Sequence, residues 1–125
     1  MRWPFWRVAV AESSMEPALR PGDWVLAWRG LPGIGQATRS ERVKVRPGQV
    51  VIARHPAQPD MLVVKRAAWH EPGGWWLDSD NKAAGATDSA HFGLVPPELI
   101  EARVLGRYWP LGRSRRPPGR TPHGR

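Results

Sequence analysis

Hydrophobic residues in this chain fall into short runs, and the residues between the runs favour turns. Glycine occurs 13 times and proline 14 times in 125 residues, which marks many turns. Short runs rich in β-branched and aromatic residues between such turns are typical of strands. We expect six strands, at Arg7–Ala11, Trp24–Arg29, Val50–Ala53, Met61–Trp69, Trp75–Leu77 and Glu98–Trp109. The pattern predicts a mainly β fold of antiparallel sheets, which belongs to the all-β class. Few short helical turns are expected, one of them after Pro96-Pro97.

Two of the expected strands follow the same kind of turn. Pro21-Gly22 precedes one strand and Pro47-Gly48 precedes another. Proline fixes φ for the first central position of a type II turn, and glycine accepts the positive φ of the second. We therefore expect two turn-and-strand units of one sheet. A hairpin is expected at Gly73-Gly74, with a loop longer than two residues because Glu71-Pro72 precedes it.

The length suits one domain with one modest core, and the charge is unevenly distributed. The formal net charge is +8, and residues 113–125 carry five arginines and no acid. We expect a domain over residues 1–112, with a mobile loop at about 30–42, and a basic disordered tail over 113–125. The tail suits weak contact with anionic membranes. No specific nucleic acid is expected as a partner, because the tail arginines lie apart from most of the tryptophans.

The hydrophobic runs are too short to cross a membrane. The longest is the five-residue run Trp24–Trp28, against the roughly 20 residues that a spanning helix needs. We therefore expect no transmembrane segment, no signal peptide and a cytoplasmic location. Trp3, Phe5 and Trp6 leave peripheral membrane contact open, with packing on the sheet as the favoured alternative.

The stretch Ser13–Asp23 places a serine on a rigid bend. Ser14 follows an apolar run, and Pro17 ends that run because proline donates no backbone hydrogen bond. A small hydroxyl on fixed backbone at the edge of a sheet suits a nucleophile. The alternative is that the serine pair only caps a short helical turn at Met15–Leu19.

Lys65 lies in an expected strand whose other residues are largely apolar. Alternate residues of a strand share a face, so Lys65 would share its face with Met61, Val63 and Ala67. Burial there would disfavour the ammonium and lower the pKa of the lysine. A serine on a rigid turn and a desolvated lysine fit a nucleophile with its general base. The alternative is a lysine at the strand end whose amine reaches solvent.

Other chemistries find less support in the sequence. The chain has no cysteine, which excludes disulfides and a thiol nucleophile. Its histidines show no metal-ligand spacing, so no metal or other cofactor is expected. They are His55, His70, His91 and His123. His91 lies near Asp88 in the sequence and leaves a Ser-His-Asp arrangement open as a minor alternative.

Short blocks around the serine and the lysine follow one another in an order known from a peptidase family. They are Ser14-Met15-x-Pro17-x-Leu19 with Gly22-Asp23, Pro47-Gly48-x-Val50-Val51, Val64-Lys65-Arg66, Asp80-Asn81, and Asp88-Ser89 with Phe92-Gly93-x-Val95. From about Val8 to Pro110 the chain resembles the signal-peptidase family of serine peptidases. Within that family it most resembles the nickel-type superoxide dismutase maturation proteases, through blocks such as Arg46-Pro47-Gly48, Arg54-His55-Pro56 and Gly73-Gly74-Trp75-Trp76.

The resemblance implies a fold, an activity and a set of site residues. The implied fold is a compact, partly open antiparallel barrel of the signal-peptidase and LexA-like peptidase type, and the implied activity is endopeptidase cleavage without a metal. Ser14 would be the nucleophile, with its backbone N–H directed to the oxyanion, and Lys65 the general base. Residues implied to support the site are Arg66, Asp80, Asn81, Asp88 and Ser89. Met15 and Pro17 are candidates for the substrate groove.

Four residues depart from the family pattern. They are Glu12, Ser79, Ala86 and Ala90. Glu12 stands where the family usually has a small or hydroxyl residue that helps the oxyanion hole, so a second oxyanion donor is not identified. Ser79 precedes Asp80 where glycine is usual, and a family serine is replaced by alanine two residues before Asp88. The arginine that usually follows Asp88-Ser89 is also missing, so Asp88 needs another cation, for which Arg66 is the candidate.

The leading hypothesis is a serine endopeptidase that uses a Ser–Lys dyad to remove an N-terminal propeptide. The resemblance suggests a nickel superoxide dismutase precursor as its substrate and partner. Two alternatives stay open. One is a general type I signal-peptidase-like enzyme that cleaves exported preproteins, and the other is a non-catalytic basic β domain that binds nucleic acid or membrane.

Overall fold

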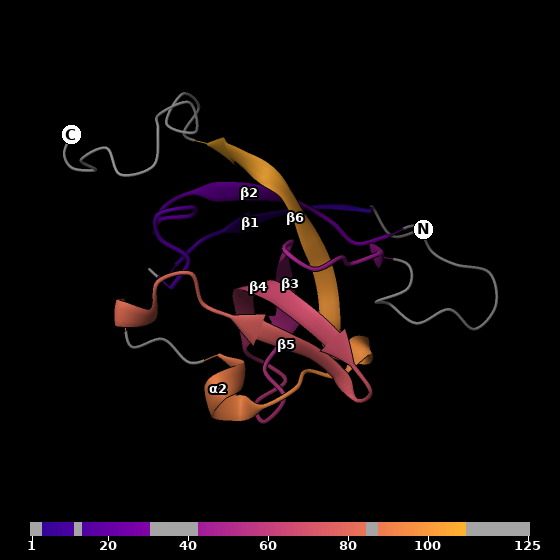
Figure 1. The fold of residues 1–125 in the computed structure, drawn as a ribbon. Helices are drawn as coiled ribbons and strands as arrows, with labels where there is room; N and C mark the ends of the chain where they lie inside the picture. Colours follow the sequence, from indigo (N-terminus) through magenta and orange to yellow (C-terminus); the bar gives the residue numbers. More distant parts are fainter. Residues whose placement is uncertain (1–3, 12–13, 31–42, 85–87, 110–125) are drawn as a thin grey trace.

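Six antiparallel strands form one open sheet in the computed structural model, which describes residues 4–11, 14–30, 43–84 and 88–109. The strands are β1 (Phe5–Ala9), β2 (Trp24–Trp28), β3 (Val50–Arg54), β4 (Leu62–Glu71), β5 (Gly74–Asp78) and β6 (Ile100–Trp109). Their order in the sheet is β1-β2-β6-β3-β4-β5, so β1 and β5 are its two edges (Figure 1). The mainly β prediction is confirmed, and within the described residues the sheet is open rather than closed into a barrel.

Helical structure in the described residues is limited to single turns. The short elements are η1 (Lys82–Ala84), α2 (Ser89–Phe92) and η2 (Pro97–Leu99). The last of these confirms the helical turn expected after Pro96-Pro97. Each predicted hydrophobic run overlaps one of the strands, with bounds that differ by a few residues, because alternation locates a strand better than it locates its ends.

The long strand β6 joins the two parts of the sheet. Its first residues pair with β3, for example Ala102 with Ile52, and its later residues pair with β2, for example Val104 with Ala27. Register shifts occur in both ladders. Such irregularities bend a strand and increase its twist. Figure 1 shows β6 running from the β3–β4–β5 part of the sheet to the β1–β2 part.

The two predicted proline–glycine turns have the same geometry. The N–H of Asp23 donates to the carbonyl of Arg20 at 3.0 Å, and Gly22 has a φ of 92°. In the second turn the corresponding hydrogen bond, from Gln49 to Arg46, is 3.1 Å long, and φ of Gly48 is 94°. Positive φ at the second central residue is the mark of a type II turn. The prediction from the repeated Pro-Gly pairs is therefore confirmed.

The β4–β5 hairpin is tighter than the sequence analysis predicts. Glu71 pairs with Gly74, so Pro72 and Gly73 alone form the connection, and the expected longer loop is wrong. Gly74 belongs to the strand because the backbone of Val95 runs directly beside it. A Cβ at Gly74 would lie 2.1 Å from the Val95 carbonyl oxygen, so only glycine fits at this position.

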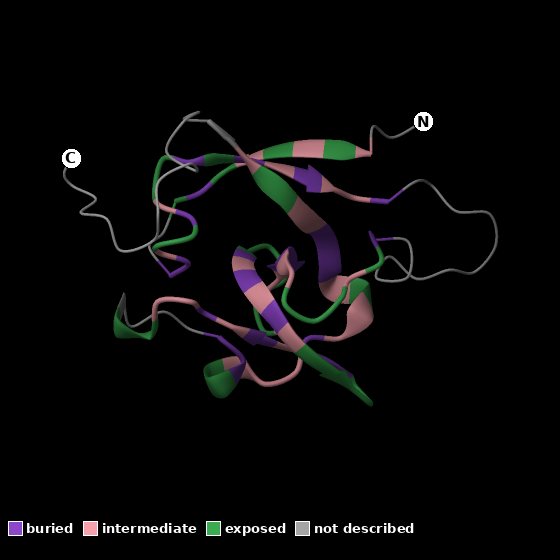
Figure 2. Cartoon of the chain, turned by 45° about the horizontal axis from the view of Figure 1, so that its top comes forward, coloured by how far each residue is buried: buried purple, intermediate pink, exposed green. Residues whose placement is uncertain are grey.

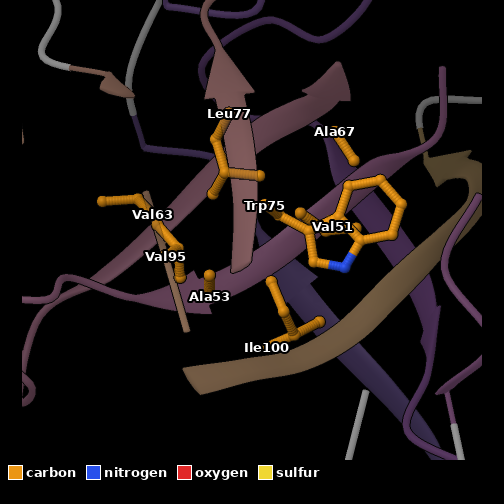
Figure 3. Packing of buried hydrophobic residues seen from close by; sticks show 8 residues of the cluster. All are labelled: Val51, Ala53, Val63, Ala67, Trp75, Leu77, Val95 and Ile100. Carbon is orange, nitrogen blue, oxygen red and sulfur yellow. The ribbon is translucent and has the colours of Figure 1, made fainter. Parts of the chain in front are cut away.

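The core consists of connected clusters on both faces of the curved sheet. One cluster gathers residues of β3, β4, β5 and β6 around Trp75 and Leu77 (Figure 3). A second cluster packs Val25 of β2 against the buried Met15, and a third packs Ala27 of β2 against Ile52 and Ala102. Figure 2 shows the buried residues concentrated along the central strands. Both predicted faces of β4 therefore contribute to packing, although Leu62 at its beginning is exposed.

Several predictions fall on residues that lie outside the described ranges. These are most of the expected loop at about 30–42, the tail 113–125, and residues Trp3, Glu12 and Ala86. Within the described residues, Trp6 packs against a core cluster, as favoured by the sequence analysis, and Phe5 contacts Trp28 edge-on at the sheet margin. Among the described helices, none has the length and apolar composition that crossing a membrane requires.

Candidate active site

Ser14 begins a turn that is fixed to the sheet at both ends. After the turn, the N–H of Gly22 donates to the carbonyl of Val10 at 2.8 Å, and the N–H of Val10 donates to the carbonyl of Asp23 at 2.7 Å. Inside the turn, Met15 is only 1% exposed and packs in the core. Ser14 itself is 5% exposed. The serine is thus held on backbone that packing and hydrogen bonds fix, as the sequence analysis predicts.

The turn after Ser14 also contains the helical bend of the alternative interpretation. The N–H of Leu19 donates to the carbonyl of Met15 at 2.9 Å, which closes one helix-like turn. The chain then enters the type II turn, so no helix follows. This single closed turn stiffens the segment that follows Ser14.

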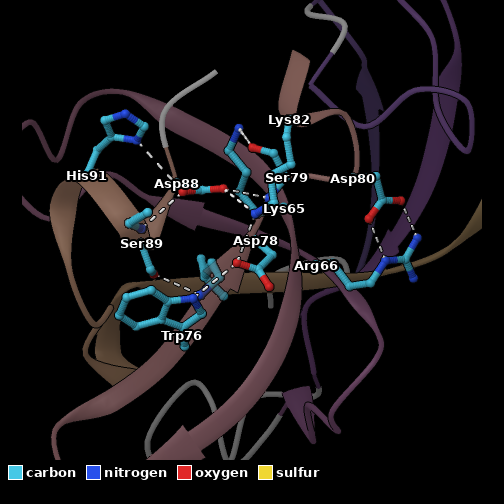
Figure 4. A network of polar contacts seen from close by, with 12 residues as sticks. Lys65, Arg66, Trp76, Asp78, Ser79, Asp80, Lys82, Asp88, Ser89 and His91 are labelled. Atoms are coloured by element: carbon cyan, nitrogen blue, oxygen red, sulfur yellow. Dashed lines mark hydrogen bonds and ion pairs between the residues drawn. The ribbon is translucent and has the colours of Figure 1, made fainter. Parts of the chain in front are cut away.

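Lys65 is buried on the inner face of a central strand. It is 2% exposed, and it shares its face with Val63 and Ala67, which are buried as predicted. Met61, predicted on the same face, precedes β4 and is 37% exposed. The Lys65 amine does not reach solvent at a strand end. Its Nζ donates to the hydroxyl Oγ of Ser79 at 3.1 Å (Figure 4).

The segment after β5 connects the lysine with the serine turn. Ser79 follows β5 directly and holds the Lys65 amine. Two residues later, the backbone N–H of Asn81 donates to the carbonyl oxygen of Ser14 at 2.7 Å. The fold therefore brings the two predicted catalytic residues to one short segment, residues 79–81, although they are 51 positions apart in the sequence.

Asp88 is a buried carboxylate that fixes this segment. It accepts from the backbone N–H of Ser79 at 3.0 Å, from the backbone N–H of Ala90 at 3.0 Å, and from Lys82 Nζ at 3.1 Å. Burial by itself would raise the pKa of the Asp88 carboxyl. The three donors outweigh burial and lower that pKa to about 2. Asp88 therefore stays ionised and ties the end of β5 to the start of α2.

The expected pairing of Arg66 with Asp88 is wrong. Arg66 forms a bidentate ion pair with Asp80, in which Nε and Nη2 donate to the two carboxylate oxygens at 2.8 Å and 2.6 Å. The hydrogen bond to Asp80 raises the pKa of the Arg66 guanidinium. Arg66 follows Lys65 in β4 and lies on the opposite face of the strand, whereas Asp88 bonds to Ser79 on the lysine side. The cation of Asp88 is Lys82, and the hydrogen bond to Asp88 raises the pKa of the Lys82 ammonium.

The other predicted residues have separate positions. Ser89 is buried, and its Oγ accepts from the backbone N–H of Leu77 at 2.8 Å, which supports β5. Pro17 is exposed. Met15, expected in the substrate groove, is instead a core residue, because the turn directs its long apolar side chain onto Val25 and neighbouring residues. His91 lies 3.8 Å from Asp88 with a side chain that is 60% exposed.

The sequence analysis did not predict two residues of this network as members of the site. Ser79 was noted only as a departure from a family pattern, and Lys82 was not singled out. The available signal for Ser79 was its position two residues after Leu77, because an extension of the expected strand Trp75–Leu77 would place it on the Leu77 face. Lys82 had no such signal, because its contact with Asp88 depends on the path of the loop between them.

Comparisons with known proteins bear on this arrangement. No protein-family model matches the chain. The chain is similar to proteases of the mitochondrial inner membrane. The mitochondrial ATP-independent inner membrane protease subunit 1a of Arabidopsis thaliana is 35% identical over 89 residues, which cover 54% of this chain and 52% of the relative. The mitochondrial inner membrane protease subunit 1 of Xenopus tropicalis is 28% identical over 132 residues, covering 90% and 73%.

The corresponding human subunit 1 is 27% identical over 118 residues, covering 78% of this chain and 66% of the relative. The match to the Arabidopsis protein thus spans about half of that relative. These similarities support a signal-peptidase-like serine peptidase as the kind of protein to which the chain is related.

Proposed function

We propose that the chain is a serine endopeptidase in which Ser14 is the nucleophile and Lys65 the general base. The main supporting observation is the Lys65 amine, which is buried and donates to the hydroxyl of Ser79, on the segment that also bonds to Ser14. Burial disfavours the charged form of a lysine in general, and a lysine must be uncharged to act as a base. The hydrogen bond from Asn81 to Ser14 supports the proposal, because it sets the serine turn beside the same segment.

The proposed reaction follows from these two groups. The Lys65 amine takes the proton of the Ser14 hydroxyl as the serine oxygen attacks the carbonyl carbon of the scissile peptide bond. The backbone N–H of Ser14 donates to the negatively charged oxygen of the tetrahedral intermediate. The Lys65 ammonium then gives its proton to the leaving amine, and the peptide C–N bond breaks. Water, with Lys65 again accepting a proton, hydrolyses the acyl-serine and restores the hydroxyl.

The proposed substrate is the N-terminal extension of a cytoplasmic precursor. The sequence blocks that resemble nickel-type superoxide dismutase maturation proteases favour a nickel superoxide dismutase precursor. A backbone amine can ligate nickel as a terminal group only after the preceding peptide bond is cut, so cleavage would permit metal loading. The second candidate is an exported preprotein, which the similarity to inner membrane proteases favours. The basic tail is proposed to add weak contact with anionic membranes.

The proposal is tested with purified protein, both kinds of precursor and two variants. Ser14→Ala and Lys65→Met should each abolish cleavage, because each removes one of the two residues of the proposed catalytic dyad. The circular dichroism spectrum should stay unchanged. Lys44→Met is the matched control, since Lys44 is exposed and should leave cleavage unchanged. Cleavage by Ser14→Ala would refute the nucleophile. If the protein trims only the exported preprotein, the nickel superoxide dismutase precursor is not its substrate and the second candidate is.

A further inference from the structure

We propose that Ser79 is a positioning residue that holds the Lys65 amine ready to accept a proton. This inference rests on the proposed Ser–Lys function. Lys65 and Ser79 are 2% and 3% exposed, and the amine donates to the hydroxyl oxygen at 3.1 Å. A lysine side chain has four rotatable carbon bonds, so a buried amine without a fixed acceptor would sample several positions. The hydrogen bond to the Ser79 hydroxyl limits those positions.

The chemistry of the acceptor matters as much as its position. A neutral amine has two hydrogens and one lone pair. When one hydrogen is bonded to the Ser79 oxygen, the lone pair remains available for the proton of Ser14. A carboxylate in the same place would also fix the amine, but it would favour the ammonium, which cannot act as a base. Ser79 therefore positions Lys65 without charging it.

Ser79 can do this because its own backbone is fixed. Its N–H donates to Asp88 at 3.0 Å, and the N–H of Leu77, two residues earlier, donates to the buried Ser89 hydroxyl at 2.8 Å. On the other side, Asn81 is bonded to the carbonyl of Ser14 at 2.7 Å. Residues 77–81 are thus tied at three points, and Figure 4 shows Ser79 between the Lys65 amine and Asp88.

The described charged groups around this pair are largely engaged with one another. Asp88 lies behind Ser79 and is neutralised by Lys82, which also contacts Asp78 at 3.3 Å. His91, on α2, approaches Asp88 from the exposed side. The Arg66–Asp80 pair lies on the other face of β4. No carboxylate other than Asp88 is bonded to Ser79 among the described residues.

The test uses three substitutions of one residue. Ser79→Ala removes the acceptor and should lower kcat about tenfold with little change in KM, which corresponds to the loss of one hydrogen bond. Ser79→Thr keeps the hydroxyl and should retain most of the rate. Ser79→Asp should move the alkaline rise of the pH–rate profile upward by about one pH unit or more, because the carboxylate favours the ammonium.

A second readout does not depend on activity. The chain has three lysines, Lys44, Lys65 and Lys82, so 13C labelling of lysine Cε gives a simple NMR spectrum. The signal that is missing from the spectrum of Lys65→Met belongs to Lys65. The Lys65 signal should titrate at higher pH in Ser79→Asp than in the wild type, whether or not the protein cleaves. Thermal unfolding checks that each variant is folded.

The outcomes separate this inference from the proposed function. If Lys65→Met abolishes cleavage while Ser79→Ala leaves kcat and the pH profile unchanged, Ser79 has no positioning role and the dyad stands. If Lys65→Met cleaves normally, the proposed function itself is wrong. An unchanged Lys65 titration in Ser79→Asp would also overturn the inference, because it would show that the two side chains do not interact.

Discussion

Replacing Asp88 by asparagine tests the most heavily bonded carboxylate of the site. The carboxylate accepts three hydrogen bonds, from Ser79, Lys82 and Ala90. Its pKa falls from 3.8 to about 2 on folding. One pKa unit corresponds to about 1.4 kcal/mol, so ionised Asp88 stabilises the folded state by about 2 kcal/mol relative to its protonated form. Asparagine can still accept from Ala90, but its amide NH2 cannot accept from Ser79.

The sign of the pH dependence follows from the direction of the shift. Because the folded-state pKa is depressed, the stabilisation is complete above the unfolded value of 3.8 and is lost as the pH falls through about 2. At pH 7 we expect Asp88→Asn to lower the free energy of unfolding by about 2 to 3 kcal/mol. The difference between wild type and variant should shrink between pH 4 and pH 2.

Urea unfolding at a series of pH values measures this difference. Subtracting the two free energies at each pH cancels the titration of the other acids, which both proteins share. A difference that stays constant from pH 7 to pH 2 would refute the reasoning, since it would assign the effect to lost packing rather than to the ionised carboxylate. A difference near zero at pH 7 would show that the three hydrogen bonds add no net stability.

Two further predictions concern the sheet and its surface. Gly74→Ala should cost about 3 kcal/mol or more, because the added Cβ would lie 2.1 Å from the Val95 carbonyl oxygen. Gly48→Ala, which has a positive φ but nothing within 4 Å of the new Cβ, should cost only about 1 kcal/mol, and equal losses in urea unfolding would contradict the steric argument. Arg66→Lys should cost less than about 1 kcal/mol, because the pair with Asp80 is partly exposed, and a loss above 2 kcal/mol would count against this estimate.

Much of the fold could be predicted from local patterns. The Pro-Gly pairs determine two turns because each residue type fits one position of the turn for a steric reason. Alternation along β4 predicted the face of Lys65, and its two neighbours on that face are buried as expected. The hairpin loop was predicted too long, because the nearness of Val95, which forces Gly74 into the strand, is a contact between distant parts of the chain.

The polar contacts of the site could be predicted only in part. Alternation places Arg66 and Lys65 on opposite faces, but the side on which Asp88 lies depends on its contact with Ser79, which the sequence does not give. The bond from Lys65 to Ser79 could not be predicted, because it depends on the register of β4 with β5, which shifts between Ala67 and Trp69. A shift of one residue in a ladder changes which side chains meet.

The pH dependence of kcat/KM tests the central claim, a neutral lysine as the base for Ser14, most directly. For the wild type acting on a cleavable precursor, the rate should rise on the alkaline side of neutrality as Lys65 loses its proton, and then level off. Lys44→Met should give the same curve, because Lys44 is exposed. Lys65→Met should show no cleavage at any pH. A wild-type rate that is flat from acid to alkaline pH, or a Lys65→Met protein with the same rise, would contradict the proposed mechanism.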